Sequence, residues 1–205
     1  FFQENGKKVV IALVVIVALA VAGYLYKTLV VDANAEKAAE LIIDAQDRFG
    51  VENPDFALAL NGDETGAGFL DVVEQYGSTA AGNLAKHYAG ICYLRLGDLE
   101  NAEKYLAMYD AVDELPGEIV NAQNLGLRGD IAVEKGEYEA AGALYKKAVA
   151  ASANLYTAPL YLYKQVLAYA ALGNKAEAVK CLEALQADYA TSTEAREAEK
   201  VVGTL

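Results

Sequence analysis

The chain has 205 residues, with 29 acidic and 17 basic side chains and a formal net charge of −12. Such an acidic chain does not attract nucleic acid or anionic lipid headgroups through its charge, so we expect no nucleic-acid partner. Cys92 and Cys181 are its only cysteines, too few for a disulfide framework, and without a CxxC pair they predict neither a zinc site nor a cofactor. We expect both to be buried and unpaired.

An uncharged stretch of 18 residues, 9–26, lies near the start of the chain. As a helix with a rise of about 1.5 Å per residue it would be roughly 27 Å long, close to the hydrocarbon thickness of a bilayer. The apolar character continues past Lys27, so we predict a transmembrane helix over residues 9–31. The alternatives are a signal peptide cleaved near Ala18-Leu19-Ala20 and a buried core helix.

Charges next to this helix predict its orientation. Lys7 and Lys8 precede it, which favours a cytoplasmic segment over residues 1–8 and places the rest of the chain across the membrane. From Thr28 onward the chain has 28 acidic and 14 basic residues. Ala18 and Ala22 have the spacing that lets a second membrane helix approach closely, so we predict that they contact one.

Residues 34–49 form an amphipathic pattern after the apolar stretch. Its apolar stripe consists of Ala35, Ala38, Ala39, Leu41, Ile42 and Ala45. No proline or glycine follows Gly23 before this segment ends, so we expect the membrane helix to continue into it. Residues 50–68 break the helical pattern and are predicted to be the one substantial loop. We therefore predict an exit helix and loop over 32–66.

Three segments share one internal spacing: residues 88–109, 127–149 and 163–185. Each reads as a helix, a glycine with a polar turn, and a second helix with an alanine five residues after the glycine and a large residue four further on. The three sets are Gly97, Ala102 and Leu106, then Gly136, Ala141 and Tyr145, then Gly173, Ala178 and Leu182. Glycine suits the left-handed residue that ends a helix, and alanine allows close packing. The pattern is that of tetratricopeptide repeats.

Two further segments, 69–85 and 181–199, resemble each other. Each reads as the end of one helix followed by a break and a new helix that a serine or threonine caps. The last helix, about 193–202, is charged and suits the solvated cap of a solenoid. We predict an all-α fold: a single N-terminal transmembrane helix, then a tetratricopeptide-repeat solenoid over 67–205 with a C-terminal capping helix.

The sequence offers no catalytic constellation. His87 is the only histidine, and no nucleophile or orienting carboxylate is paired with it by spacing. Residues 61–68, NGDETGAG, lack the Lys-Ser/Thr of a phosphate loop and the alternating oxygen ligands of a calcium loop. We expect a binding protein and not an enzyme.

The first helix of each repeat lines the concave face of such a solenoid, which we predict to be a protein-binding groove for an extended or helical segment. By repeat register its residues are Leu84, His87, Ile91, Leu94, Arg95, Gln123, Asp130, Val133, Glu134, Leu160, Tyr163 and Leu167. The alternative for Leu160 and Leu167 is that they simply meet the next helix.

The opening FFQENGKK, a single span, an alanine-rich exit helix and about three degenerate repeats together resemble the YfgM family. The match is most specific at Phe1, Phe2, Glu4, Asn5, Gly6 and Lys7, and segments 97–106 and 127–149 are also similar. The resemblance implies a bacterial inner-membrane protein with a periplasmic domain, ancillary to the SecYEG translocon and associated with the membrane-anchored periplasmic chaperone PpiD. The 53–68 loop is longer than the family pattern.

We therefore expect an ancillary subunit of the Sec translocon, an adaptor between translocation and periplasmic chaperones. Its expected partners are SecYEG, a PpiD-like chaperone, emerging secretory chains and the lipid bilayer. The alternative is a scaffold for envelope assembly or cell division that is unconnected to secretion. Proteins that co-purify in mild detergent would distinguish the two.

Overall fold

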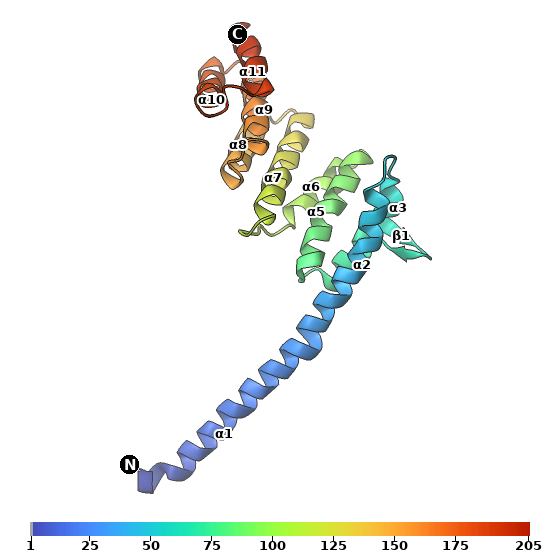
Figure 1. Ribbon diagram of the computed structural model, residues 1–205, viewed down its shortest axis with the longest axis vertical. Coiled ribbons are helices and arrows are strands. Elements are labelled where there is room, and N and C mark those ends of the chain that lie inside the picture. The colour runs from blue at the N-terminus through green and yellow to red at the C-terminus, as the bar shows by residue number, and fades with distance from the viewer. Residues whose placement is uncertain (1) are drawn as a thin grey trace. The chain divides into compact units, whose positions relative to one another are not determined.

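The computed structural model describes residues 2–205, with side chains from Lys7 onward. Phe1, the first residue of the predicted cytoplasmic segment 1–8, lies outside the described residues. The chain divides into two compact units, one up to Ala85 and one from Lys86 to Leu205. Helices make up nearly all the regular structure of the described residues, so the predicted all-α class is confirmed (Figure 1).

A single uninterrupted helix begins the first unit (Figure 1). It consists of α1 (Phe2–Tyr26), a π-helical segment η1 (Lys27–Asp32) and α2 (Ala33–Phe49). The predicted continuation of the apolar helix into the amphipathic segment is thus confirmed. A π-turn adds a residue to the turn, which rotates the faces on its two sides by about 100° relative to each other.

The apolar part of this helix is long and apolar enough to cross a membrane. It belongs to the 43-residue part of this helix from Lys7 to Phe49, and none of the most apolar 18-residue window of that part is buried. A core helix would be covered by other elements, so the alternative of a buried core helix is wrong for this structure. A signal peptide near the N-terminus can have the length and composition of this apolar helix, so the signal-peptide alternative is not decided by them.

The amphipathic face of α2 packs against the rest of the first unit. Ala38, Ile42 and Ala45, at helical spacing, are buried where α2 meets α3 (Phe56–Asn61) and α4 (Phe69–Tyr76). The other members of the predicted stripe are partly buried or exposed. Small residues on this face let the three helices approach one another closely.

The prediction of one irregular loop over 50–68 is wrong in part. It contains α3 and a short antiparallel hairpin of β1 (Gly62–Asp63) and β2 (Gly66–Ala67). Arg48 at the end of α2 holds this hairpin. Its guanidinium donates to the Asp63 carboxylate at 2.7 Å, to the Thr65 hydroxyl at 3.1 Å and to the Gly66 carbonyl at 3.1 Å.

The second unit is built from antiparallel helix pairs. It begins within α5 (Ala80–Arg95), which packs against the next helix: a Cβ added to Gly90 would lie 2.5 Å from Cγ of Leu106. The helices that follow are α6 (Leu99–Ala107), α7 (Gly117–Glu134), α8 (Tyr138–Ala151), α9 (Thr157–Ala171), α10 (Lys175–Asp188) and α11 (Thr193–Gly203). The α7–α8 pair, the α8–α9 neighbours and the α9–α10 pair make its largest contacts. We call α5, α7 and α9 the first helices of their pairs.

The glycine at the turn of each pair is left-handed, as predicted. Gly97, Gly136 and Gly173 have φ of +82°, +75° and +68°. At Gly136 the backbone N–H bonds the Val133 carbonyl at 2.9 Å, and the next N–H, that of Glu137, bonds the Ala132 carbonyl at 2.8 Å. The other two turns repeat this bond pattern, which satisfies the last carbonyls of the first helix.

The large residue of each repeat packs against the first helix. A Cβ added to Gly129 of α7 would lie 2.5 Å from Cε1 of Tyr145 on α8, so only glycine permits this approach. Tyr145 is 2% exposed and shares a buried cluster with Ala141 and Tyr161. The predicted internal spacing therefore reports real contacts between paired helices.

The two predicted caps are present. The Thr79 hydroxyl accepts from the Gly82 N–H at 3.0 Å at the start of α5, and the Ser192 hydroxyl accepts from the Ala195 N–H at 3.0 Å at the start of α11. Helix α11 buries Ala195, Ala198 and Val202 against α9 and α10. Its opposite face is charged, as the predicted capping helix requires.

Candidate protein-binding site

The predicted groove residues lie on α5, α7 and α9. Leu84 belongs to the first unit and is partly buried. The others belong to the second unit, where their exposure varies. Arg95, Gln123, Glu134, Leu160 and Leu167 are exposed, Leu94, Asp130, Val133 and Tyr163 are partly buried, and His87 and Ile91 are buried.

His87 lies in the packed interior between α5 and α7, with 1% of its surface exposed. Its Nδ1 is 3.3 Å from the Asn124 side-chain amide, and its Nε2 is 3.3 Å from the Gln123 side-chain carbonyl. These partners fit a neutral ring that carries its proton on Nε2. Burial lowers the His87 pKa to about 4, against a smaller upward effect of the Gln123 bond. His87 therefore holds two helices together and does not face an open surface.

Three predicted groove residues meet at one pocket. Asp130 and Val133 of α7 and Leu167 of α9 line a pocket of about 230 Å³. We call it the Asp130 pocket. Its remaining lining residues are Tyr138, Tyr145, Lys164 and Ala168. The walls are mainly apolar, and the polar groups are concentrated around one carboxylate.

The Asp130 carboxylate joins three helices. The Lys164 ammonium of α9 donates to Oδ1 at 2.8 Å and to Oδ2 at 2.7 Å, and the Tyr145 hydroxyl of α8 donates to Oδ1 at 2.7 Å. Burial raises the Tyr145 pKa, and its hydrogen bond to Asp130 raises it further, so the phenol stays protonated and continues to donate. The pocket thus combines fixed polar groups with an apolar wall, which is the general composition of small-molecule and side-chain binding sites in proteins.

Sequence reasoning missed four of the pocket residues, although it had named Tyr145 as a packing residue of its repeat: Tyr138, Tyr145, Lys164 and Ala168. Lys164 could have been found, because it lies 34 residues after Asp130, about one repeat further along the chain. Opposite charges at that distance on consecutive first helices predict an ion pair between neighbouring repeats. Tyr138 lies at the start of a second helix, and the register of first helices does not include it.

The remaining predicted residues are not brought to this pocket. Leu94 packs beside the buried Leu106 and Ile131, and Tyr163 packs beside a separate cluster with α10 and α11. Leu160 is 37% exposed and does not line the pocket. The groove as a continuous binding surface therefore stays a prediction.

A second pocket, of about 380 Å³, lies among α8, α9 and α10. Gln165 is central to it: its amide donates to the Gly142 carbonyl at 2.9 Å, and its side-chain carbonyl accepts from the Cys181 thiol at 3.1 Å. Burial raises the pKa of Cys181 to about 11 and that of Cys92 to about 12. Both cysteines are free and buried, as predicted.

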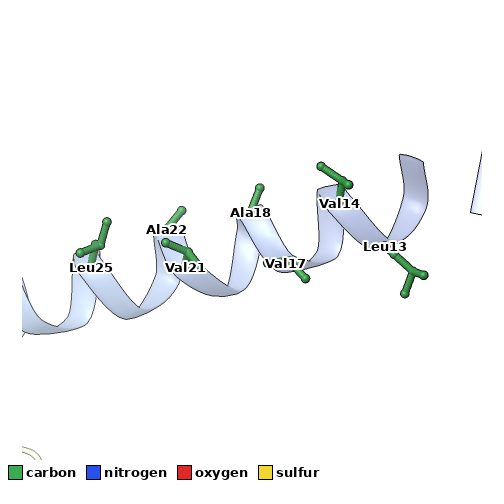
Figure 2. A pocket seen from close by; sticks show the side chains of 7 residues that line it. All are labelled: Leu13, Val14, Val17, Ala18, Val21, Ala22 and Leu25. Atoms are coloured by element: carbon green, nitrogen blue, oxygen red, sulfur yellow. The ribbon is translucent and has the colours of Figure 1, made fainter. Parts of the chain in front are cut away.

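On α1, a shallow apolar groove contains both predicted membrane-contact residues. Figure 2 shows Ala18 and Ala22 projecting from the same side of the helix as Val14 and Leu25. The two alanines leave room between the larger side chains. The complete lining is Leu13, Val14, Val17, Ala18, Val21, Ala22 and Leu25. Contact with another membrane helix stays a prediction.

Comparison with known families identifies two of the helix pairs. Residues 122–155 and 161–192 each match a family model described as Tetratricopeptide repeat. These segments contain most of α7–α8 and α9–α10, which are the pairs that form the Asp130 pocket. No curated protein and no solved structure matches the chain. The C-terminal region therefore contains tetratricopeptide repeats, which indicate an adaptor for protein–protein interaction, and such repeats are typically scaffolds without catalytic activity.

Proposed function

We propose that this chain is an ancillary subunit of the bacterial Sec translocon, a membrane-anchored adaptor that links translocation to periplasmic chaperones. One observation carries the proposal: the Asp130 pocket opens between two tetratricopeptide repeats of a chain that also has a helix of membrane-spanning length. The resemblance to the YfgM family supplies the identity of the complex. The proposed partners are SecYEG and a PpiD-like chaperone.

The proposed topology is a single pass through the inner membrane, with residues 1–8 cytoplasmic, 9–31 in the membrane and the C-terminal region periplasmic. Lys7 and Lys8 before the apolar helix support this orientation. The absence of a break between α1 and α2 supports a close connection between the anchor and the first unit. Residues 32–66 and 67–205 are the proposed exit segment and repeat domain.

The pocket also favours a protein segment as the bound molecule. Its apolar walls suit one aliphatic or aromatic side chain, and Asp130 with Lys164 offers both signs of charge to the flanking backbone or side chains. The formal charge of −12 disfavours nucleic acid as an alternative partner. An emerging secretory chain and a fixed chaperone segment both have the required chemistry.

Photo-crosslinking tests the proposal directly. A photoreactive residue at Leu167, in the pocket, should crosslink to a translocon subunit or to the periplasmic chaperone in intact cells. Leu172 is the matched control, because it directly follows α9 and is 43% exposed but does not line the pocket. Products from Leu167 that contain only cell-wall or division proteins would reject the Sec assignment and favour the envelope scaffold.

The membrane contact is tested separately. Ala18→Leu with Ala22→Leu fills the space between Val14 and Leu25, so co-purification with SecYEG in mild detergent should fall. Ala12→Leu with Ala20→Leu is the control, because both alanines lie in the same apolar helix but outside this groove. Equal co-purification of all variants would show that the α1 groove is not the attachment.

A further inference from the structure

Two connections between helix pairs expose large apolar side chains. Leu115, before α7, and Leu155, before α9, are both 75% exposed, and Tyr156 is 86% exposed. Among the residues that the structure describes, no large apolar side chain is more exposed than these three, including those on α1. Leaving such side chains in water costs hydrophobic free energy, so their exposure requires a reason.

These side chains lie at one edge of the second unit. α7 and α8 are antiparallel, and so are α8 and α9. The start of α7, the end of α8 and the start of α9 therefore lie at the same end of the helices (Figure 1). The glycine turns at Gly97, Gly136 and Gly173 lie at the opposite end. We call Leu115, Leu155 and Tyr156, with the connections that carry them, the connection edge.

The connection before α7 is held in place by Asn121. The side-chain oxygen of Asn121, Oδ1, accepts from the Val112 N–H at 3.0 Å and from the Tyr109 hydroxyl at 2.9 Å. Its side-chain amide nitrogen, Nδ2, donates to the Val112 carbonyl at 2.9 Å. Asn121 is itself 8% exposed. The path of the chain toward Leu115 is therefore fixed by hydrogen bonds from inside the unit.

The connection before α9 has an equivalent device. The Asn154 side-chain oxygen accepts from the Tyr156 N–H at 2.8 Å and the Thr157 N–H at 2.9 Å, and its amide donates to the Ser152 hydroxyl at 2.8 Å. The Thr157 hydroxyl donates to the Ser152 carbonyl at 2.7 Å. Both connections thus present their apolar side chains from a preorganised backbone, which lowers the entropy cost of binding.

The charge of the connection edge has one sign. Between Lys104 and Arg128 the chain has four acidic residues and no basic one. The Lys86 ammonium lies 3.6 Å from Oδ2 of Asp110. Within the described residues, no ion pair involves the other three acidic residues, Asp113, Glu114 and Glu118. Residues 152–163 carry no charge. Apolar side chains are therefore flanked by unneutralised carboxylates.

We propose that the connection edge is a second docking surface, separate from the Asp130 pocket, and that it binds a cationic amphipathic helix of a partner protein. The apolar face of that helix covers Leu115, Leu155 and Tyr156, and its lysines or arginines reach Asp113, Glu114 and Glu118. A lipid surface fits less well, because insertion of Leu115 would carry Glu114 toward the headgroups.

The sequence contains no tryptophan, so Tyr156→Trp creates a single fluorescent reporter at an exposed position. The full chain in phosphatidylcholine nanodiscs is titrated with a helical peptide of about 14 residues that has leucines on one face and lysines on the other. Empty nanodiscs give the lipid contribution. We expect saturable binding with a blue shift of Trp emission.

Leu115→Ser with Leu155→Ser in the same background should weaken peptide binding about tenfold or more, because both removed side chains are central to the contact. Leu96→Ser with Leu172→Ser is the matched control: these leucines are 49% and 43% exposed but lie next to the glycine turns at the other end of the helices. The control should keep its affinity. An unchanged affinity of the first variant, or an equal loss in the control, would overturn the proposal. Circular dichroism checks that both variants remain helical.

Replacing Asp113, Glu114 and Glu118 by their amides should lower the affinity and flatten its dependence on salt. Unchanged salt dependence would overturn the cationic character of the partner. Brominated lipids in the nanodisc, which quench Trp fluorescence on contact, test whether the lipid bilayer covers the connection edge instead of a protein helix. Strong quenching of Trp at position 156 before peptide is added, comparable to a Val21→Trp reporter in the apolar helix, would show that the edge binds the bilayer instead. We expect little quenching at position 156.

Discussion

The Lys164 ammonium on α9 lies 2.7 Å from Oδ2 of Asp130 on α7, so an ion pair joins the first helices of two consecutive tetratricopeptide repeats. The Tyr145 hydroxyl on α8 donates to the same carboxylate. These three side chains connect α7, α8 and α9 to one another at the Asp130 pocket. The Asp130 pocket and a contact between repeats are therefore built from the same side chains.

Asp130→Asn should lower the free energy of unfolding by about 1 kcal/mol. The effect is modest because the Lys164 and Asp130 side chains keep 29% and 33% of their surface exposed, where water screens the charges. Urea unfolding of the full chain in detergent micelles, with Lys164→Gln and the double variant, gives the coupling energy. Glu197→Gln, which breaks an exposed pair within α11, is the control and should change stability by less than about 0.5 kcal/mol. A coupling of zero would show that the ion pair does not stabilise the repeats.

His87 should make the second unit sensitive to acid. Its pKa is lowered to about 4 in the folded chain, from an ordinary value of 6.5, mainly by burial. Above pH 6.5 the ring is neutral in both states. As the pH falls below 6.5 the unfolded chain takes up the proton first, so stability decreases until the folded ring also titrates near pH 4. The loss should be on the order of 3 kcal/mol.

The measurement is urea unfolding between pH 7.5 and pH 3.5, since carboxylates also titrate in part of this range. The contribution of His87 is the difference between the chain and His87→Gln, which has no titratable side chain at that position. If the two pH profiles are parallel between about pH 6.5 and pH 4, the His87 ring is not held neutral.

Gly136→Ala should destabilise the α7–α8 pair by about 1–2 kcal/mol. A Cβ at Gly136 would contact nothing within 4 Å, so the cost comes only from the φ of +75°. Gly203→Ala is the control: it also has open space around its Cβ, but its φ is not positive. Thermal unfolding by circular dichroism should show a lower midpoint for the first variant only, and equal midpoints would contradict the left-handed turn.

Ala141→Glu should cost several kcal/mol, because Ala141 is fully buried between α7 and α8 and a carboxylate there would be overpacked and unpaired. Thermal unfolding provides the measurement. Glu139→Ala, two residues earlier on the exposed face, should be tolerated. An unchanged midpoint for Ala141→Glu would show that the helix register is wrong.

A reporter fused after Leu205 should be active only on the periplasmic side if the proposed orientation holds. Lys7→Glu with Lys8→Glu should mix the two orientations, because the positive charge before the apolar helix is then removed. Alkaline phosphatase activity, which requires the periplasm, and a cytoplasmic fluorescent reporter measure the two populations. A fusion that is cytoplasmic in the unchanged chain would reject the proposed topology and, with it, the proposed link between the Sec translocon and periplasmic chaperones.

The repeat architecture could be predicted because its signals are local. Gly136, Ala141 and Tyr145 lie within ten residues of one another, and each has one physical role: a left-handed turn, a close approach and a filled interface. The same holds for the Ser192 cap of α11 and for the unbroken helix from α1 to α2. Chain geometry over a few turns is enough to produce these features.

By itself, then, the sequence determined the helical class, the membrane-length apolar helix and the order of the paired helices. Only the tertiary structure decided which side chains meet across helices. Arg48 folds the 62–67 segment into a hairpin, Asn124 and Gln123 enclose His87, and Lys164 closes one side of the Asp130 pocket. Each of these contacts joins residues 15 to 37 positions apart. Repeat spacing predicts which face a residue lies on, but a polar side chain finds its partner only when packing has fixed the distance between the faces.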